Sequence, residues 1–248
     1  MRRSEIFLAA SILGLASPVA AGPTEDFKAL TDEYWAFTMR ENPTFASQLG
    51  MREYDDRLSD ISLAAEDRRT ATAVGYLRRL AAIPDSGLSP ADKINKAILK
   101  RSLTESVEAN AFGQRMMLFS NRSGWHQEMA GLAEGLTFKT RRDYDNYLKR
   151  LAAYPALNEE AIRISTRAAS EGFVLPCLSL NGFESTISGV IPADPTKSRL
   201  YQPFAADRPA SVTAAEWTAL QGRGRALIDG ELRQAYAKHL AWYSGTYK

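Results

Sequence analysis

Cysteine and histidine are scarce in this sequence. Its 248 residues include one cysteine, Cys177, and two histidines, His126 and His239. A single cysteine excludes an intrachain disulfide, and the apolar stretch after Pro176 predicts an inert, buried thiol rather than a reactive thiolate. The formal net charge is only +2, with no dense basic stripe, which argues against a nucleic-acid partner.

Long apolar runs are missing except at the N-terminus. Two arginines precede the run IFLAASILGLA (residues 6–16), and small residues at 19–21 offer a cleavage site after Ala21. The run is well short of the roughly 20 residues that span a bilayer. We therefore predict a secretory signal peptide, residues 1–21, with a retained N-terminal anchor as the alternative. The mature chain, residues 22–248, would be periplasmic or secreted, with no membrane attachment.

Strand patterns are also scarce, since no alternation of β-branched and polar residues exceeds about five positions. Apolar residues instead recur at spacings of three and four, which is typical of helices. The sequence predicts an all-α fold of antiparallel helical hairpins in a bundle or array, with a long proline-containing loop near 192–212. The expected helices cover residues 25–41, 63–83, 90–112, a segment from Thr140 to a break at Pro155, 156–171, and 214 toward the chain end.

The segment NRSGWHQEMA (121–130) has a histidine and a glutamate two residues apart. A helical zinc site of the HExxH type needs histidines at i and i+4 with a glutamate beside the first. Here position 130 is alanine, and Glu128 lies about 200° around a helix from His126. We therefore expect His126 to be a partly buried residue beside Trp125, hydrogen-bonded to backbone. A remote pair of His126 and His239 with a carboxylate is the alternative.

Other patterns associated with catalysis are incomplete. GFESTISG (182–189) lacks the spacing of a G-x-S-x-G nucleophile elbow, and Gly222-Arg223-Gly224 lies inside a predicted helix rather than in a phosphate-binding loop. The acidic pairs Asp55-Asp56 and Glu159-Glu160 are typical of solvated surface, and Asn121-Arg122-Ser123 is a glycosylation acceptor only in a host that glycosylates. The residues alone assign no catalytic, cofactor-binding or metal-binding position.

Three segments together resemble the bacterial family called domain of unknown function 885. DEYWAFTMRENPTFASQLGMREYDDRLSD (32–60) is similar to its opening signature: a Tyr-Trp helix, a Glu-Asn-Pro break, an Ala-Ser-x-Leu-Gly turn and a Tyr-Asp-Asp-Arg-Leu loop. SGWHQEMAGLAEGLTFKTRRDYDNYLKRLAAYP (123–155) and EGFVLPCLSLNGFESTIS (171–188) resemble the blocks that follow. These segments occur in the order and spacing of the family, and the resemblance spans nearly all of the mature chain.

The resemblance implies a mostly helical, exported protein whose longer relatives carry a zinc segment of the gluzincin peptidase type in their second half. No position here matches those zinc ligands or the catalytic glutamate, so zinc is expected only with the missing C-terminal half. The ending HLAWYSGTYK has no clear helix stop and favours a truncated chain.

These observations allow three interpretations of the chain. The chain is the non-catalytic N-terminal half of an exported zinc-metallopeptidase-like hydrolase, a stand-alone periplasmic module that binds a peptide or protein, or a decayed remnant. The candidate partners are the missing half or a peptide, and the sequence does not indicate an oligomeric state.

Overall fold

Helices make up most of the protein in the computed structural model, which describes residues 22–248. The predicted signal peptide therefore lies outside the described residues. The described part contains no β-strand, which confirms the all-α prediction. The helices are α1 (Pro23–Glu41), α2 (Pro43–Gln48), α3 (Leu63–Ala82), α4 (Pro90–Ala111), α5 (Trp125–Ala130), α6 (Arg141–Ser170), α7 (Phe183–Ser188), α8 (Gln202–Ala205), α9 (Ala214–Leu227) and α10 (Arg233–Trp242).

Side-chain caps begin the long helices where the sequence predicts them. The hydroxyls of Ser62 and Ser89 accept hydrogen bonds from backbone amides in the first turns of α3 and α4. Thr140 and Thr213 form capping boxes with the acidic residues three positions on, at the starts of α6 and α9. Each cap satisfies amides that the helix itself leaves free, so these boundaries are set by local sequence.

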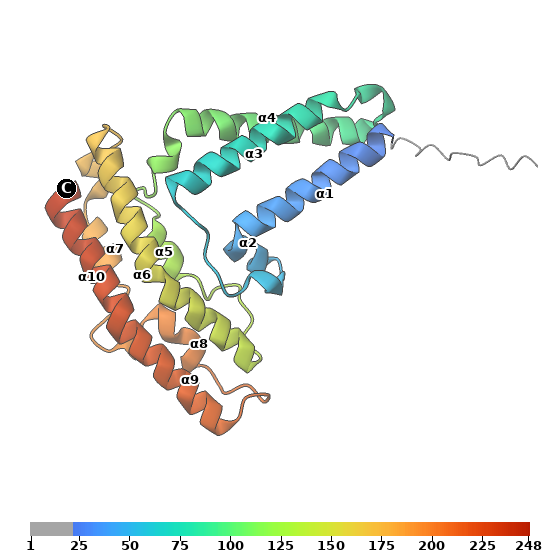
Figure 1. The fold of residues 1–248 in the computed structure, drawn as a ribbon. Coiled ribbons are helices and arrows are strands. Elements are labelled where there is room, and N and C mark those ends of the chain that lie inside the picture. Colours follow the sequence, from blue (N-terminus) through green and yellow to red (C-terminus); the bar gives the residue numbers. More distant parts are fainter. Residues whose placement is uncertain (1–21) are drawn as a thin grey trace, which may run out of the picture.

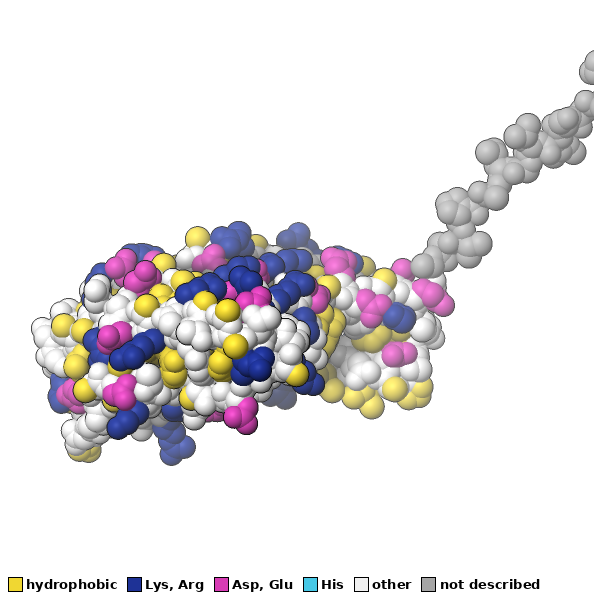
Figure 2. Space-filling view, turned by 90° about the horizontal axis from the view of Figure 1, so that it is seen from below, with side chains coloured by type: hydrophobic (Ala, Val, Ile, Leu, Met, Phe, Trp, Pro, Cys, Tyr) yellow, Lys and Arg dark blue, Asp and Glu magenta, His cyan; other side chains and the backbone are white. Residues whose placement is uncertain are grey.

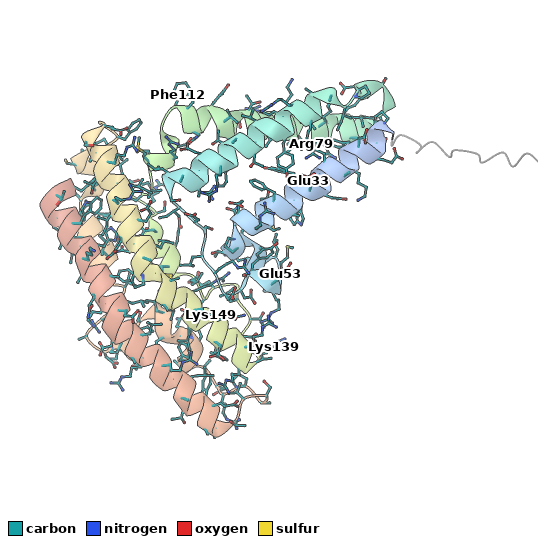
Figure 3. The ribbon with its side chains drawn as sticks, in the orientation of Figure 1. Glu33, Glu53, Arg79, Phe112, Lys139 and Lys149 are labelled. Carbon is teal, nitrogen blue, oxygen red and sulfur yellow. The ribbon has the colours of Figure 1, made fainter. Side chains whose placement is uncertain are left out.

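Helices α1, α3 and α4 form one part of the molecule, which we call the arm (Figure 1). Consecutive helices α3 and α4 make an antiparallel hairpin, and α1 packs beside it over a shared apolar core. Ion pairs from Glu33 to Arg79 (2.7 Å) and from Glu41 to Arg69 (3.3 Å) show that α1 and α3 are antiparallel, since the residue order reverses between them. Figure 3 shows Glu33 and Arg79 facing each other between the two helices.

Helices α5 to α10 form the larger part of the molecule, which we call the body, around the largest core (Figure 1). Its long helices run parallel, because Arg141 pairs with Glu216 (3.0 Å) near their starts and Glu159 pairs with Lys238 (2.6 Å) further along. The chain crosses back between α6 and α9 through residues 171–213. The antiparallel helical hairpins predicted from the sequence therefore occur in the arm, whereas α6 runs parallel to α9 and α10 in the body. From 214 onward the chain stays helical almost to its end, with π-helical stretches at Ile228–Leu232 and Tyr243–Tyr247.

The predicted helix break at Pro155 is wrong, because α6 continues through it from Arg141 to Ser170. Proline in a helix interior removes one backbone hydrogen bond and costs about 3 kcal/mol. The turns on both sides bury Leu151, Tyr154 and Asn158 completely. Burying a large apolar side chain stabilises a fold by about 1.5–3 kcal/mol, so packing of α6 against the core outweighs the local penalty.

The predicted loop near 192–212 holds no long helix but is far from irregular. It contains short 3₁₀ turns at Pro195–Lys197 and Arg199–Tyr201, followed by α8. Within this segment Leu200, Phe204 and Val212 lie in the core with no exposed surface. The prolines thus shape tight turns that pack against α6 and α9.

Arg150 joins the segment around α2 to the body. Its guanidinium is fully buried and donates hydrogen bonds to the backbone oxygens of Pro43 (3.1 Å), Tyr54 (3.0 Å) and Arg57 (2.9 Å), and to the Ser47 hydroxyl (2.7 Å). Burial lowers the pKa of this guanidinium from its ordinary value. The four hydrogen bonds hold residues 43–57 against α6.

Candidate functional site

The two histidines, distant in sequence, meet inside the body. His126 lies on α5 and His239 on α10; their ring centroids are 5.0 Å apart, with the planes at 74°. Neither side chain has any exposed surface. The sequence prediction for His126 is wrong on two points: the residue is fully rather than partly buried, and its ring bonds to a side chain, Thr186, instead of to backbone.

The bond to Thr186 fixes the tautomer of the neutral His126 ring. The Thr186 hydroxyl donates to the Phe183 carbonyl (2.7 Å), so it accepts at 2.9 Å from Nε2 of His126. The other ring nitrogen of His126 and both ring nitrogens of His239 have no hydrogen-bond partner among residues 22–248. Because His126 acts as the donor, it is not placed to remove a proton from Thr186, and this arrangement is not a nucleophile–base pair.

An aromatic frame holds the pair in place. Trp125 stacks on His239 with ring centroids 4.2 Å apart, and its indole nitrogen donates to Asn158 of α6 (2.8 Å). The Tyr236 hydroxyl donates to the His126 carbonyl (2.8 Å). Side chains from α5, α6 and α10 therefore fix both rings within the largest core.

Burial keeps both imidazoles neutral. It lowers the pKa of His126 to about 4 and, together with the nearby His126, lowers the pKa of His239 to about 3. No cluster of three or more His, Cys, Asp or Glu side chains suited to a metal ion occurs within residues 22–248. The alternative prediction, a remote pair of His126 and His239 with a carboxylate, is therefore correct for the two histidines but not for the carboxylate. Catalytic zinc sites take three protein ligands, and this pair offers two.

A groove lies where the segment around α2 meets the body, with a volume of about 460 Å³. We call it the α2–α5 groove. Apolar side chains dominate its walls, and half-exposed Phe45 forms part of them. Glu128 is exposed there and has no ion-pair partner within the described chain. The residues that line it are Asn42, Thr44, Phe45, Gln48, Leu58, Ser59, Ile61, Trp125, Glu128, Met129, Gly131, Leu132, Tyr154 and Leu157.

Sequence patterns did not reveal this groove, because its walls come from four separate stretches of chain. The single pattern that touches it is the segment 121–130, where Glu128 does turn away from His126: His126 points into the core and Glu128 toward the groove. The prediction that Glu128 and His126 lie on opposite faces of a helix is therefore confirmed.

The remaining sequence candidates have mixed outcomes. Cys177 is exposed, so the prediction of a buried thiol is wrong; it lies in a short 3₁₀ turn at Cys177–Leu180 rather than in the core. Gly222-Arg223-Gly224 lies inside α9, as predicted, and Gly224 is there for packing, since a Cβ would lie 2.7 Å from the Phe204 ring. Residues 183–188 form the short helix α7 rather than a nucleophile elbow.

The acidic pairs lie in different surroundings. Glu159 is largely exposed, in an ion pair with Lys238, as expected for solvated surface. Asp55 is different: its side chain is only 14% exposed beside Arg52, because the loop that carries it is pressed against α6. The Asn121-Arg122-Ser123 segment is an exposed turn.

Together these features define a class: an all-helical protein with an open, largely apolar groove and a closed, neutral histidine pair. The family model described as "Bacterial protein of unknown function (DUF885)" matches residues 43–248, and the chain belongs to that family. A comparison with curated proteins gives no match. None of the helices described is long and apolar enough to cross a membrane.

Proposed function

We propose that this chain is the non-catalytic, N-terminal part of an exported zinc-metallopeptidase-like hydrolase. The observation that carries the proposal is the state of the histidines: both are sealed in the core, neutral, and without a third ligand within residues 22–248. In such hydrolases a zinc-bound water attacks a carbonyl while a glutamate acts as base. This chain would leave that chemistry to a separate zinc-bearing segment.

The role proposed for the chain itself is to form one wall of the peptide cleft through the α2–α5 groove. Ligand sites are typically concave, mostly apolar, and furnished with a few polar groups that orient the ligand. The groove fits this description, with Phe45 as an accessible apolar contact and Glu128 as an unpaired anion for a cationic group. Its walls are held by the buried Arg150 hydrogen bonds.

The test combines the purified mature chain with a separately produced zinc-bearing C-terminal segment of the same family. We expect no peptide hydrolysis by either piece alone and zinc-dependent hydrolysis by the mixture. Phe45→Glu should raise KM for the mixture, whereas Trp35→Glu, on α1 and of similar exposure, should not. Hydrolysis by the homogeneous chain alone, lost in His126→Ala or His239→Ala, would contradict the proposal.

A second candidate is a stand-alone peptide-binding module, favoured by the accessibility of the groove within this chain. A ligand that binds only the folded state raises its stability by mass action. Short apolar peptides with a cationic end should then raise the melting temperature without zinc, and Glu128→Gln should weaken the effect. Stabilisation of the chain without activity in the mixture would favour this candidate over the first.

A further inference from the structure

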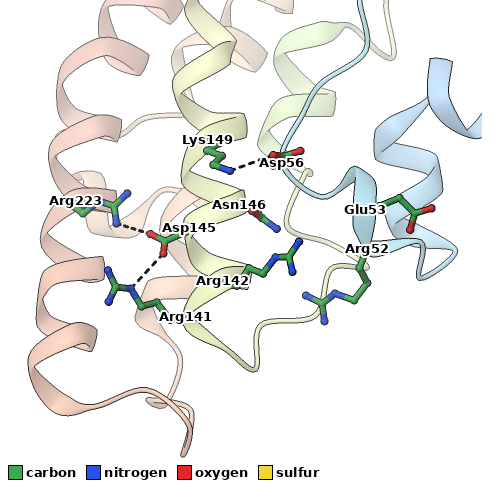
Figure 4. Close-up of a pocket in the computed structure, with 9 residues that line it drawn as sticks. All are labelled: Arg52, Glu53, Asp56, Arg141, Arg142, Asp145, Asn146, Lys149 and Arg223. Carbon is green, nitrogen blue, oxygen red and sulfur yellow. Dashed lines mark hydrogen bonds and ion pairs between the residues drawn. The ribbon is translucent and has the colours of Figure 1, made fainter.

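A second hollow, about 540 Å³ in volume, lies on the body where α6 begins (Figure 4). We call it the basic pocket. Five cationic and three acidic side chains line it, leaving a surplus of two positive charges. The space-filling view from this end shows Lys and Arg side chains gathered together, with a few acidic ones among them (Figure 2). The pocket lies apart from the α2–α5 groove and shares no lining residue with it.

Most charges in the pocket already have partners. Asp145 accepts from Arg223 (2.6 Å) and lies 3.4 Å from Arg141, while Asp56 pairs with Lys149 at 3.2 Å. These pairs fix the flanking cations on the pocket wall (Figure 4). These pairs therefore hold Arg141, Lys149 and Arg223 in position before any ligand arrives, while also offsetting their charges.

Arg142 stands out, because no carboxylate of the described chain lies within 4.0 Å of its guanidinium. Figure 4 shows it extending from α6 toward the Arg52–Tyr54 turn, where Arg52 faces it. Arg52 itself pairs with Asp55 (3.2 Å) and with the buried Asp143, which lie outside the pocket lining. Glu53, also without an ion-pair partner, turns away from α6 in the same view. A free guanidinium fork next to further cations is a good receptor for a planar or tetrahedral oxyanion.

Asn146 offers a second donor beside Arg142. It is four residues after Arg142, one turn along the same face of α6, and its side chain lines the pocket. Only 8% of the residue is exposed, and its amide makes no hydrogen bond within residues 22–248. The amide atoms are not sealed from solvent, so the amide opens into the pocket and is free to donate to a bound oxyanion.

We propose that the basic pocket binds a small ligand through a carboxylate or phosphate group. Arg142 makes the bidentate contact, and the Asn146 amide donates a third hydrogen bond from one turn further along α6. Arg52 and Lys149 line the two sides of the bound oxyanion with their charges shared with carboxylates, so the unpaired Arg142 carries the recognition. The site needs neither zinc nor a second chain, so it is independent of the peptidase proposal.

Calorimetric titration of the mature chain at low ionic strength tests this site. The probes are inorganic phosphate, N-acetyl-dialanine with a free C-terminal carboxylate, and the same dipeptide with its C-terminus amidated. We expect phosphate, the free acid, or both to bind and the amide not to bind. Binding of phosphate alone identifies a phosphorylated ligand, and binding of the free acid alone identifies a carboxylate ligand.

Variants separate a built site from general attraction to a basic surface. Arg142→Gln and Asn146→Asp should each weaken binding of the preferred probe by about tenfold or more. Arg78→Gln, which removes an exposed arginine of α3 outside the pocket, should leave it unchanged. Melting curves without ligand confirm that each variant is folded. Absence of binding by both anions, equal binding of the amide, or equal weakening by all three substitutions would overturn the proposal.

Discussion

Lowering the pH from about 7.5 to about 5 is expected to destabilise this protein through its two buried histidines. In the unfolded chain each imidazole has its ordinary pKa of 6.5, whereas in the folded chain the values are about 4 for His126 and about 3 for His239. The unfolded state therefore binds more protons than the folded state throughout this range. Stability is fully present above pH 6.5 and falls as the pH decreases toward the folded-state values.

The size of the effect follows from the distance between the assay pH and the unfolded-state pKa. At pH 5 the unfolded imidazoles are about 1.5 units below their pKa, and each unit is worth about 1.4 kcal/mol. Each histidine should therefore cost about 2 kcal/mol of unfolding free energy, and the pair about 4 kcal/mol. Domains are usually stable by about 5–15 kcal/mol, so a loss of this size is a large share of the total.

Urea unfolding followed by tryptophan fluorescence measures this loss at each pH. The control is the double variant His126→Gln/His239→Gln, whose amides do not titrate; its stability should change little over the same range. If the double variant does not fold, His239→Gln alone should remove about half of the pH dependence. A wild-type chain equally stable at both pH values, or one that matches the double variant in slope, would refute the reasoning.

Three further expectations concern packing and exposure. Arg150→Met should lower the unfolding free energy by at least about 3 kcal/mol, because buried oxygens of residues 43–57 lose their donor; an unchanged urea midpoint would contradict the role given to this residue. Gly224→Ala should cost about 1–3 kcal/mol through the clash with Phe204, whereas Gly222→Ala, with open space around it, should stabilise α9 by about 0.5–1 kcal/mol. Reversed signs in the same urea assay would show that the packing argument is wrong. Cys177 should react fully with Ellman's reagent in native buffer, since its thiol is exposed, and protection until denaturant is added would contradict this.

The candidate sites could be predicted only in fragments. The sequence identified His126 and His239 as the only imidazoles and ruled out a local zinc motif around His126, because that geometry depends on residues one helical turn apart. It did not show that the rings touch, that they are dry, or that Thr186 fixes the His126 proton. Nor did it indicate the basic pocket, since Arg52 and Arg142 meet only after the chain has folded.

The sequence by itself determined the helical class and most helix ends. Hydroxyl caps such as Ser62, Ser89 and Thr213 act within three or four residues, so their effect can be read without knowing the fold. The tertiary structure decided what depends on distant partners: helix α6 runs through Pro155 because its neighbouring turns are buried, and α6 runs parallel to α9 and α10. It also buried both histidines and left Cys177 in solvent. The physical reason is the distance along the chain over which each interaction acts. A cap is a contact between residues close in sequence, whereas burial depends on which distant segment packs against the residue.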